Sequence, residues 1–289
     1  MTAERCAAAC VRRGDPMTAT APPVLRWLLV EQPKAWGPDP WRDCDLPAPV
    51  IAGLAERAAA VGARVLLIRK PGRHTDAPLR WAYVDSVREL TWWSTFTDPH
   101  DLLTAPWPSG TPTAEPAYLV CAHGRHDTCC ALRGRPVAAA LAATRPEATW
   151  ECSHVGGDRF AANLVALPHG FYFGQVGVDA VTGLADRFEA GRLTVPLLRG
   201  RSTVTAPVQA AQRIARERTG EDAVHAYAPV SVTPLGRDRW SVALDGLPEP
   251  IRLRATFTTS DSPLTCSATA NSRMRSFIED TEDTEDTED

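Results

Sequence analysis

Cysteine and histidine residues gather in one stretch near the middle of the chain, from Cys121 to Asp158. A first group reads Cys121-Ala-His-Gly-Arg-His-Asp-Thr-Cys129-Cys130, and a second, about twenty residues later, reads Cys-Ser-His-Val-Gly-Gly-Asp. Thiolate and imidazole are soft ligands, and two groups of them suit a metal ion or an iron–sulfur cluster. This stretch is therefore the candidate functional site.

The spacing of the first group disfavours two common cysteine sites. Seven residues separate Cys121 from Cys129, and eight separate it from Cys130. Zinc ribbons and thioredoxin-type redox sites use Cys-x2-Cys instead. Because adjacent cysteines reach one metal only with awkward backbone geometry, we expect one of Cys129 and Cys130 to be a ligand and the other a packed thiol.

The second group places His154 and Asp158 four positions apart, with Gly156 and Gly157 between them. Glycine lets the backbone approach a bulky inorganic group and donate N–H bonds to it. We therefore expect the imidazole and both glycines to line a bound cofactor.

Other polar residues nearby fit supporting roles. We expect Arg125 and Arg159 to hydrogen-bond near the cofactor, to steer an anionic partner, or to form surface salt bridges. Asn163 is expected to pin the second loop through its amide. His123 and His126 are expected to be loop residues, with ligation as the lesser alternative.

Secondary-structure signals indicate what positions these residues. A strand, helix, strand, hairpin and helix follow one another, and we expect them at 116–121, 137–143, 149–153, 160–176 and 183–190. This order is that of the thioredoxin fold. The predicted fold class is therefore α/β (α+β), with a thioredoxin-like central domain.

Flanking segments predict an α/β module before this domain and a small appendage after it. The module has strands at 25–30, 64–69 and 79–84 and a helix at 48–62, and the appendage has a helix at 208–218 and strands at 230–233, 239–244 and 251–257. The Pro-, Gly-, Ser- and Thr-rich segment 106–116 reads as a linker. The predicted parts are a flexible extension (1–23), the module (24–115), the thioredoxin-like domain (116–205), the appendage (206–270) and a disordered acidic tail (271–289).

Charge and composition exclude several function classes. The chain has 289 residues and a net charge of −4, and eight acids lie in 279–289, so nothing global indicates nucleic-acid binding. No run approaches the roughly 20 apolar residues of a membrane span. Cysteines crowded within a long chain favour a reduced, cytoplasmic setting over a secreted disulfide framework.

The first 16 residues carry Cys6 and Cys10 but no apolar core, so they are no secretory signal. Met17 is an alternative start, which would make this segment a dispensable extension. We expect neither cysteine to be a ligand.

The segments Val120–Pro136 and Ser153–Asn163 together resemble the sucrase/ferredoxin-like family, a branch of the thioredoxin-like [2Fe–2S] ferredoxins. The resemblance extends over about residues 25–267. It implies a [2Fe–2S] cluster held by a Cys pair in the first loop and a residue pair at x3 spacing in the second, for electron transfer or redox sensing with an unidentified redox partner protein. Because the sequence also has no flavin or nicotinamide fingerprint, we expect a carrier or sensor and not a self-contained enzyme.

Carried over by position, the resemblance makes Cys121 and Cys130 the first pair and His154 the first member of the second pair. Asp158 stands where eukaryotic members of the family have a second His, so the fourth ligand is open. We prefer Asp158, then Cys129, then Cys152.

This ligand set has electrostatic consequences. Neutral imidazole in place of thiolate raises a [2Fe–2S] potential, to about −150 to +300 mV in Rieske centres against about −400 mV for plant-type ferredoxins. An anionic Asp158 offsets part of that rise, so we expect a potential between the two classes. The free ring nitrogen of His154 would couple electron uptake to protonation.

Three alternatives use the same residues differently. They are a mononuclear zinc site of a structural or hydrolytic protein, a thiol-redox role for Cys129 and Cys130, and a non-catalytic interaction module. Sugar hydrolysis has no support, because no motif identifies a pair of positioned carboxyl groups. No G-x-G-x-x-G follows a strand, so no flavin or nicotinamide fingerprint is present.

Overall fold

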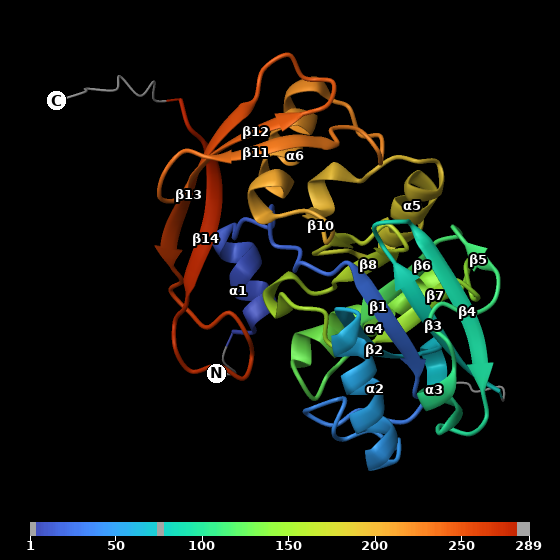
Figure 1. Cartoon of the computed structure of the whole chain (residues 1–289). Coiled ribbons are helices and arrows are strands. Elements are labelled where there is room, and N and C mark those ends of the chain that lie inside the picture. Colours follow the sequence, from blue (N-terminus) through green and yellow to red (C-terminus); the bar gives the residue numbers. More distant parts are fainter. Residues whose placement is uncertain (1–3, 74–77, 282–289) are drawn as a thin grey trace.

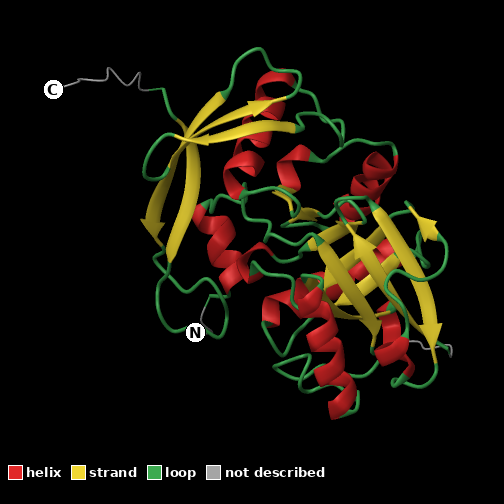
Figure 2. Ribbon diagram, viewed as in Figure 1, coloured by secondary structure: helices red, strands yellow, loops and turns green. Residues whose placement is uncertain are grey.

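The computed structural model describes residues 4–73 and 78–281, which form two separate sheets (Figure 1). The larger sheet has ten strands in the order β10-β9-β8-β6-β7-β2-β1-β3-β4-β5, and the smaller has four in the order β11-β12-β13-β14. Figure 2 shows helices packed beside both sheets, so the molecule is a mixed α/β protein as the sequence predicted.

The first half of the larger sheet is a strand–helix–strand unit followed by a hairpin. Its elements are β1 (Arg26–Glu31), α2 (Ala48–Ala60), β2 (Ala63–Arg69), β3 (Leu79–Asp85), β4 (Leu90–Phe96), α3 (Asp101–Thr104) and β5 (Pro112–Thr113). β1 and β2 are parallel, and a parallel pair needs a crossover that covers one face of the sheet. α2 supplies it, burying Val50 and Leu54 against Leu28 and Val30 of β1.

The second half repeats this order and contains the candidate site. Its elements are β6 (Ala117–Cys121), α4 (Thr128–Ala142), β7 (Thr149–Cys152), β8 (Leu164–Leu167), β9 (Phe171–Phe173), α5 (Val178–Glu189) and β10 (Leu198–Arg201). β6 and β7 are parallel, β8 is antiparallel to β6, and β9 is antiparallel to β8. The predicted thioredoxin-like arrangement of this part is confirmed.

The two halves join through β2 and β7, which pair antiparallel, with Arg69 opposite Glu151. These two side chains form a buried ion pair of 2.8 Å across the join. One sheet thus continues through the predicted module and the thioredoxin-like domain. In the first half, Glu31 ends the strand that corresponds to β6, where the second half has Cys121.

The appendage packs α6 (Ala206–Thr219) against the smaller sheet. The strands of this sheet are β11 (Pro229–Pro234), β12 (Arg239–Leu244), β13 (Ile251–Thr259) and β14 (Arg273–Glu279). Here the structure differs from the predicted tail, since β14 occupies part of 271–289 and pairs along its length with β13. Residues 282–289 of that predicted tail lie outside the described residues.

The N-terminal segment also differs from the predicted flexible extension. Residues Cys6–Arg13 form helix α1, with Cys6, Ala7, Ala9 and Cys10 buried. Arginines at its C-terminal end suit the negative end of the helix dipole, and Gly14 follows in the left-handed conformation that ends many helices. In Figure 1, α1 lies between the larger sheet and the long β13–β14 hairpin.

No helix within the two described ranges has both the length and the apolar character needed to cross a bilayer.

Candidate metal centre

Cys121 lies at the end of β6, beside Cys152 at the end of β7. Both side chains are fully buried, in an apolar cluster that also contains Cys130. The backbone N–H of Cys121 donates to the carbonyl of Asn163, which ties the strand end to the second loop. The thiol of Cys121 therefore sits at a fixed point, shielded from solvent, where strand gives way to loop.

Cys130 reaches the same point from the first turn of α4. The structure starts this helix at Thr128, nine residues before the predicted start, because Asp127 caps it by accepting from the N–H of Cys129 at 2.7 Å. Gly134 then lets the helix run against the strand end, since a Cβ there would lie 2.0 Å from the carbonyl oxygen of Cys121. The close approach of helix and strand brings the two thiols together.

The second loop delivers His154 and Asp158. His154 Nδ1 lies 3.0 Å from Asp158 Oδ1, and the Cys130 thiol donates to the same carboxylate oxygen at 3.3 Å. The ligand atoms of Cys121, Cys130 and His154 all lie within 4.8 Å of one another. Residues from two loops thus meet at one point, with Asp158 bridging them.

His126 lies in the loop between β6 and α4, as the sequence predicted, and its side chain belongs to this group. Its ring stacks on that of His154 at 3.8 Å between centroids, and its Nε2 lies 3.5 Å from Asp158 Oδ2. The ligand atoms of His126, His154 and Asp158 lie within 4.8 Å of one another. His123 instead contacts the carbonyl oxygen of Gly37 through Nε2 at 2.7 Å, away from the carboxylate.

The side chains of this group shift one another's pKa values. A hydrogen bond from Cys130 lowers the pKa of the Cys121 thiol, with further help from His154, and the same bond raises the pKa of Cys130. Burial disfavours a charged His154, but Asp158 and Cys121 outweigh it and raise its pKa to about 9. Burial also disfavours the Asp158 carboxylate, yet His126 and His154 hold the pKa of Asp158 well below its usual value.

Arg199 holds the second loop in shape, a role that the sequence did not indicate. This fully buried side chain donates to the carbonyl of Gly156 at 2.8 Å and to Asn163 Oδ1 at 2.7 Å. Asn163 in turn donates to the carbonyl of Gly157 at 2.8 Å, as the sequence predicted. Gly157 has φ +82°, and a Cβ there would lie 2.6 Å from the Arg199 guanidinium.

The remaining predicted residues lie elsewhere. Cys129 turns away from Cys130 and packs with Cys6 of α1. Cys152 is buried in the apolar cluster, outside the groups of ligand atoms that the described residues form. Arg159 forms an ion pair of 3.3 Å with Asp15, so it binds the N-terminal segment instead of facing a partner. Arg125 lines a surface cavity of about 280 Å³.

The sequence of this chain matches a known protein family. The sequence model of the sucrase/ferredoxin-like family matches residues 17–200, more than half of the chain. The chain belongs to the sucrase/ferredoxin-like family.

Among solved structures, this sucrase/ferredoxin-like protein is similar to the Cys59Ser variant of the thioredoxin-like [2Fe–2S] ferredoxin from Aquifex aeolicus. The identity is 19%, the TM-score is 0.25, and the match covers 29% of this chain and 97% of that one. No curated protein matches the chain.

A second group of possible metal ligands lies beside the first, and two of its members fall outside the segment that matches the sucrase/ferredoxin-like family. It consists of Cys6, Asp127, Cys129 and Cys266. Sequence spacing gave no signal for it, because Cys6 and Cys266 are 260 positions apart. Only the folded chain brings them together.

Proposed function

We propose that this protein binds a [2Fe–2S] cluster and serves in electron transfer or redox sensing with a protein partner. Cys121, Cys130, His154 and Asp158 would hold the cluster. The observation that carries the proposal is the convergence of these four side chains. The ligand atoms of Cys121, Cys130 and His154 lie within 4.8 Å of one another, and Asp158 Oδ1 lies 3.3 Å from Cys130 Sγ and 3.0 Å from His154 Nδ1.

The chemistry of the donors fits such a cluster. Two thiols and an imidazole are the ligand types that iron–sulfur centres use. Asp158 is buried and stays ionised, because its pKa is held low by His126 and His154. Buried charges are costly unless they are paired or coordinate a metal, so an anionic oxygen at this point suits a cationic iron. A low pKa of the Cys121 thiol likewise favours the thiolate that iron requires.

When bound, a [2Fe–2S] cluster supplies a centre that takes up and returns one electron. The protein surrounds this point with apolar groups on the Cys121 side, which exclude water. On the other side the ring of His154 stacks with that of His126, whose side chain is 38% exposed. This pair of rings marks the face on which a redox partner would approach.

His154 would also bind and release a proton. Its ring nitrogen Nδ1 faces Asp158, which favours the protonated ring. An electron added to a bound cluster would increase the negative charge at this point, and that charge would also favour protonation of the His154 imidazole. We therefore expect electron and proton uptake to be coupled at this side chain.

Anaerobic purification followed by iron and sulfide analysis, visible spectra and EPR tests the proposal. The unaltered protein should be reddish-brown and contain equal iron and acid-labile sulfide. Cys121→Ser, Cys130→Ser and His154→Ala should each lose the chromophore or change its spectrum. Cys152→Ser is the matched control, because it alters an equally buried thiol that pairs in register with Cys121.

The same experiment distinguishes the rival functions. A colourless protein whose zinc content falls in Cys121→Ser would replace the iron–sulfur proposal with a zinc site. Redox activity that survives removal of iron would support a thiol-disulfide function instead. The first result would refute the proposed cluster, and the second would refute its proposed role in electron transfer.

A further inference from the structure

Three thiols from distant parts of the chain meet beside the first turn of α4. Cys6 comes from α1, Cys129 from α4, and Cys266 from the loop between β13 and β14. The sulfur of Cys266 lies 3.4 Å from the sulfur of Cys6 and 3.4 Å from that of Cys129. All three thiols are free, and Cys6 and Cys129 are buried.

A carboxylate completes the group. Asp127 is buried, and the Cys6 thiol lies 3.6 Å from its Oδ2. Its two oxygens accept from the backbone N–H of Cys129 at 2.7 Å and of Cys266 at 2.6 Å. Such hydrogen bonds fix the direction of a carboxylate that ligates a metal. The four ligand atoms lie within 4.8 Å of one another.

We propose that Cys6, Cys129, Cys266 and Asp127 form a tetrahedral site for a single zinc ion, separate from the cluster site. Zn–S bonds of about 2.3 Å place the sulfurs of a tetrahedral site about 3.8 Å apart. The observed separations of 3.4 Å are close to this value and far from the ~2.05 Å of a disulfide. Four protein ligands leave no open position, which is the pattern of a structural zinc site.

Two features favour an ion over a disulfide. One disulfide joins two of the three sulfurs and leaves the third thiol without a partner sulfur. A zinc ion uses all four groups. The remaining negative charge of the three-thiolate site lies at the first turn of a 15-residue helix, where the positive end of the helix dipole stabilises it.

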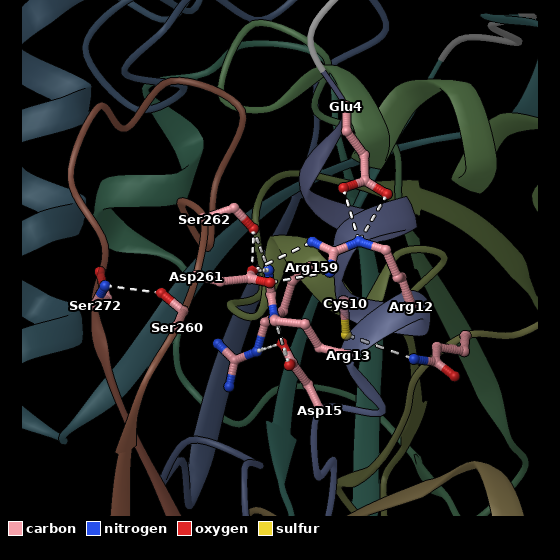
Figure 3. Close-up of polar contacts among 11 residues, drawn as sticks. Glu4, Cys10, Arg12, Arg13, Asp15, Arg159, Ser260, Asp261, Ser262 and Ser272 are labelled. Atoms are coloured by element: carbon pink, nitrogen blue, oxygen red, sulfur yellow. Dashed lines mark hydrogen bonds and ion pairs between the residues drawn. The ribbon is translucent and has the colours of Figure 1, made fainter.

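The surrounding ion pairs hold the N-terminal segment against the β13–β14 loop and against the second loop without the metal. Figure 3 shows Asp261 of the β13–β14 loop between Arg12 and Arg13 of the N-terminal helix, at 2.9 Å and 3.2 Å. Asp15 links Arg13, at 2.7 Å, to Arg159 of the second loop. The zinc ion would thus join segments that are already docked.

The adjacent cysteines serve different sites in this arrangement. Cys130 faces Asp158 and the cluster ligands, whereas Cys129 faces Cys6 and Cys266. Zinc would therefore fix the turn of α4 that presents Cys130. It would also hold α1 over the 3₁₀ turn 158–160, which carries Asp158.

Metal analysis of the full chain, expressed with iron and zinc and purified anaerobically, tests the site. We expect about one zinc per chain. Cys6→Ser and Cys266→Ser should lose it and keep their iron, whereas Cys44→Ser, a half-buried thiol outside both groups, should keep both metals. Cys121→Ser should lose iron and keep zinc, so failure of the cluster proposal leaves the zinc result intact.

X-ray absorption at the zinc edge of the unaltered protein avoids any question of folding in the variants. Three sulfurs and one oxygen at tetrahedral distances would support the site. Absence of zinc, a zinc content unchanged in Cys266→Ser, or a shell of two sulfurs and two lighter atoms would overturn it. A disulfide between Cys266 and either partner in the anaerobic protein would do the same.

Discussion

Replacement of Gly134 by alanine adds a single methyl group, and this change should disrupt the candidate metal centre. A Cβ at this position of α4 would lie 2.0 Å from the backbone oxygen of Cys121, and ordinary contact begins at 3.4 Å. In Gly134→Ala, helix and strand must therefore separate by about 1.4 Å, the difference between these distances. Backbone atoms cannot turn aside as a side chain does, so the whole first turn with Cys130 has to move.

Two effects of this substitution on the free energy of unfolding oppose each other. Alanine in place of glycine within a helix stabilises it by about 1 kcal/mol. Overpacking of a tight interior costs typically about 1–3 kcal/mol, and more where the backbone is rigid. Because the added Cβ meets backbone, we take the upper end of this range, about 3 kcal/mol. Gly134→Ala should therefore lower the free energy of unfolding by about 2 kcal/mol after the helix gain is subtracted, and it should lower the iron content as Cys130 leaves Cys121.

Gly183→Ala in α5 is the matched control, since its Cβ would meet nothing within 4 Å. This variant should be stabilised by about 1 kcal/mol, because it has the helix gain alone. Urea denaturation at equilibrium and iron analysis of both variants measure the difference. Equal stability and equal iron content in the two variants would refute the close approach of α4 to Cys121.

The remaining predictions concern the electrostatics and support of the centre. In the metal-free protein, the His154 ring should stay protonated through neutral pH and titrate with a pKa of about 9, which NMR of the ring can measure. Asp158→Asn should lower that pKa. An unchanged pKa in the variant would contradict the pairing of His154 with Asp158. In the iron-loaded unaltered protein, the midpoint potential should lie between about −400 mV and the Rieske range, and it should become more negative as pH rises. Asp158→Asn should raise this potential. A plant-type, pH-independent midpoint in a redox titration would count against these ligands. Arg199→Met should cost about 2–4 kcal/mol in urea denaturation, because it leaves the Gly156 carbonyl and Asn163 without their donor. Arg237→Ala, whose side chain is 98% exposed, should change stability by no more than about 0.5 kcal/mol.

The parts that could be predicted from the sequence are those governed by local pattern. Short apolar runs gave the strands that end at Cys121 and Cys152, and the thioredoxin-like order followed from them. The start of α4 was misplaced because Gly134 and Pro136 usually mark helix ends, whereas here the glycine permits close packing and the Asp127 cap starts the helix earlier.

The parts that could not be predicted depend on contacts between distant segments. α1 has few large apolar residues, and its order depends on Cys129 and on ion pairs with Asp261. The pairing of β14 with β13 likewise adds order to a segment whose acidic end suggested a solvated tail. Arg199 resembled any charged surface residue, since nothing in its neighbourhood along the chain indicates that it is fully buried.

The antiparallel join of β2 and β7 has a consequence for how this protein exists in solution. Without the first half, β7 would be an edge strand with unpaired N–H and C=O groups, and such an edge invites pairing between copies. The first half covers that edge with a strand of the same chain and closes it with the Arg69–Glu151 ion pair. A repeat unit without the cysteine ligands thus occupies the edge of β7, so this edge of the half that contains the candidate site is not available for pairing between copies.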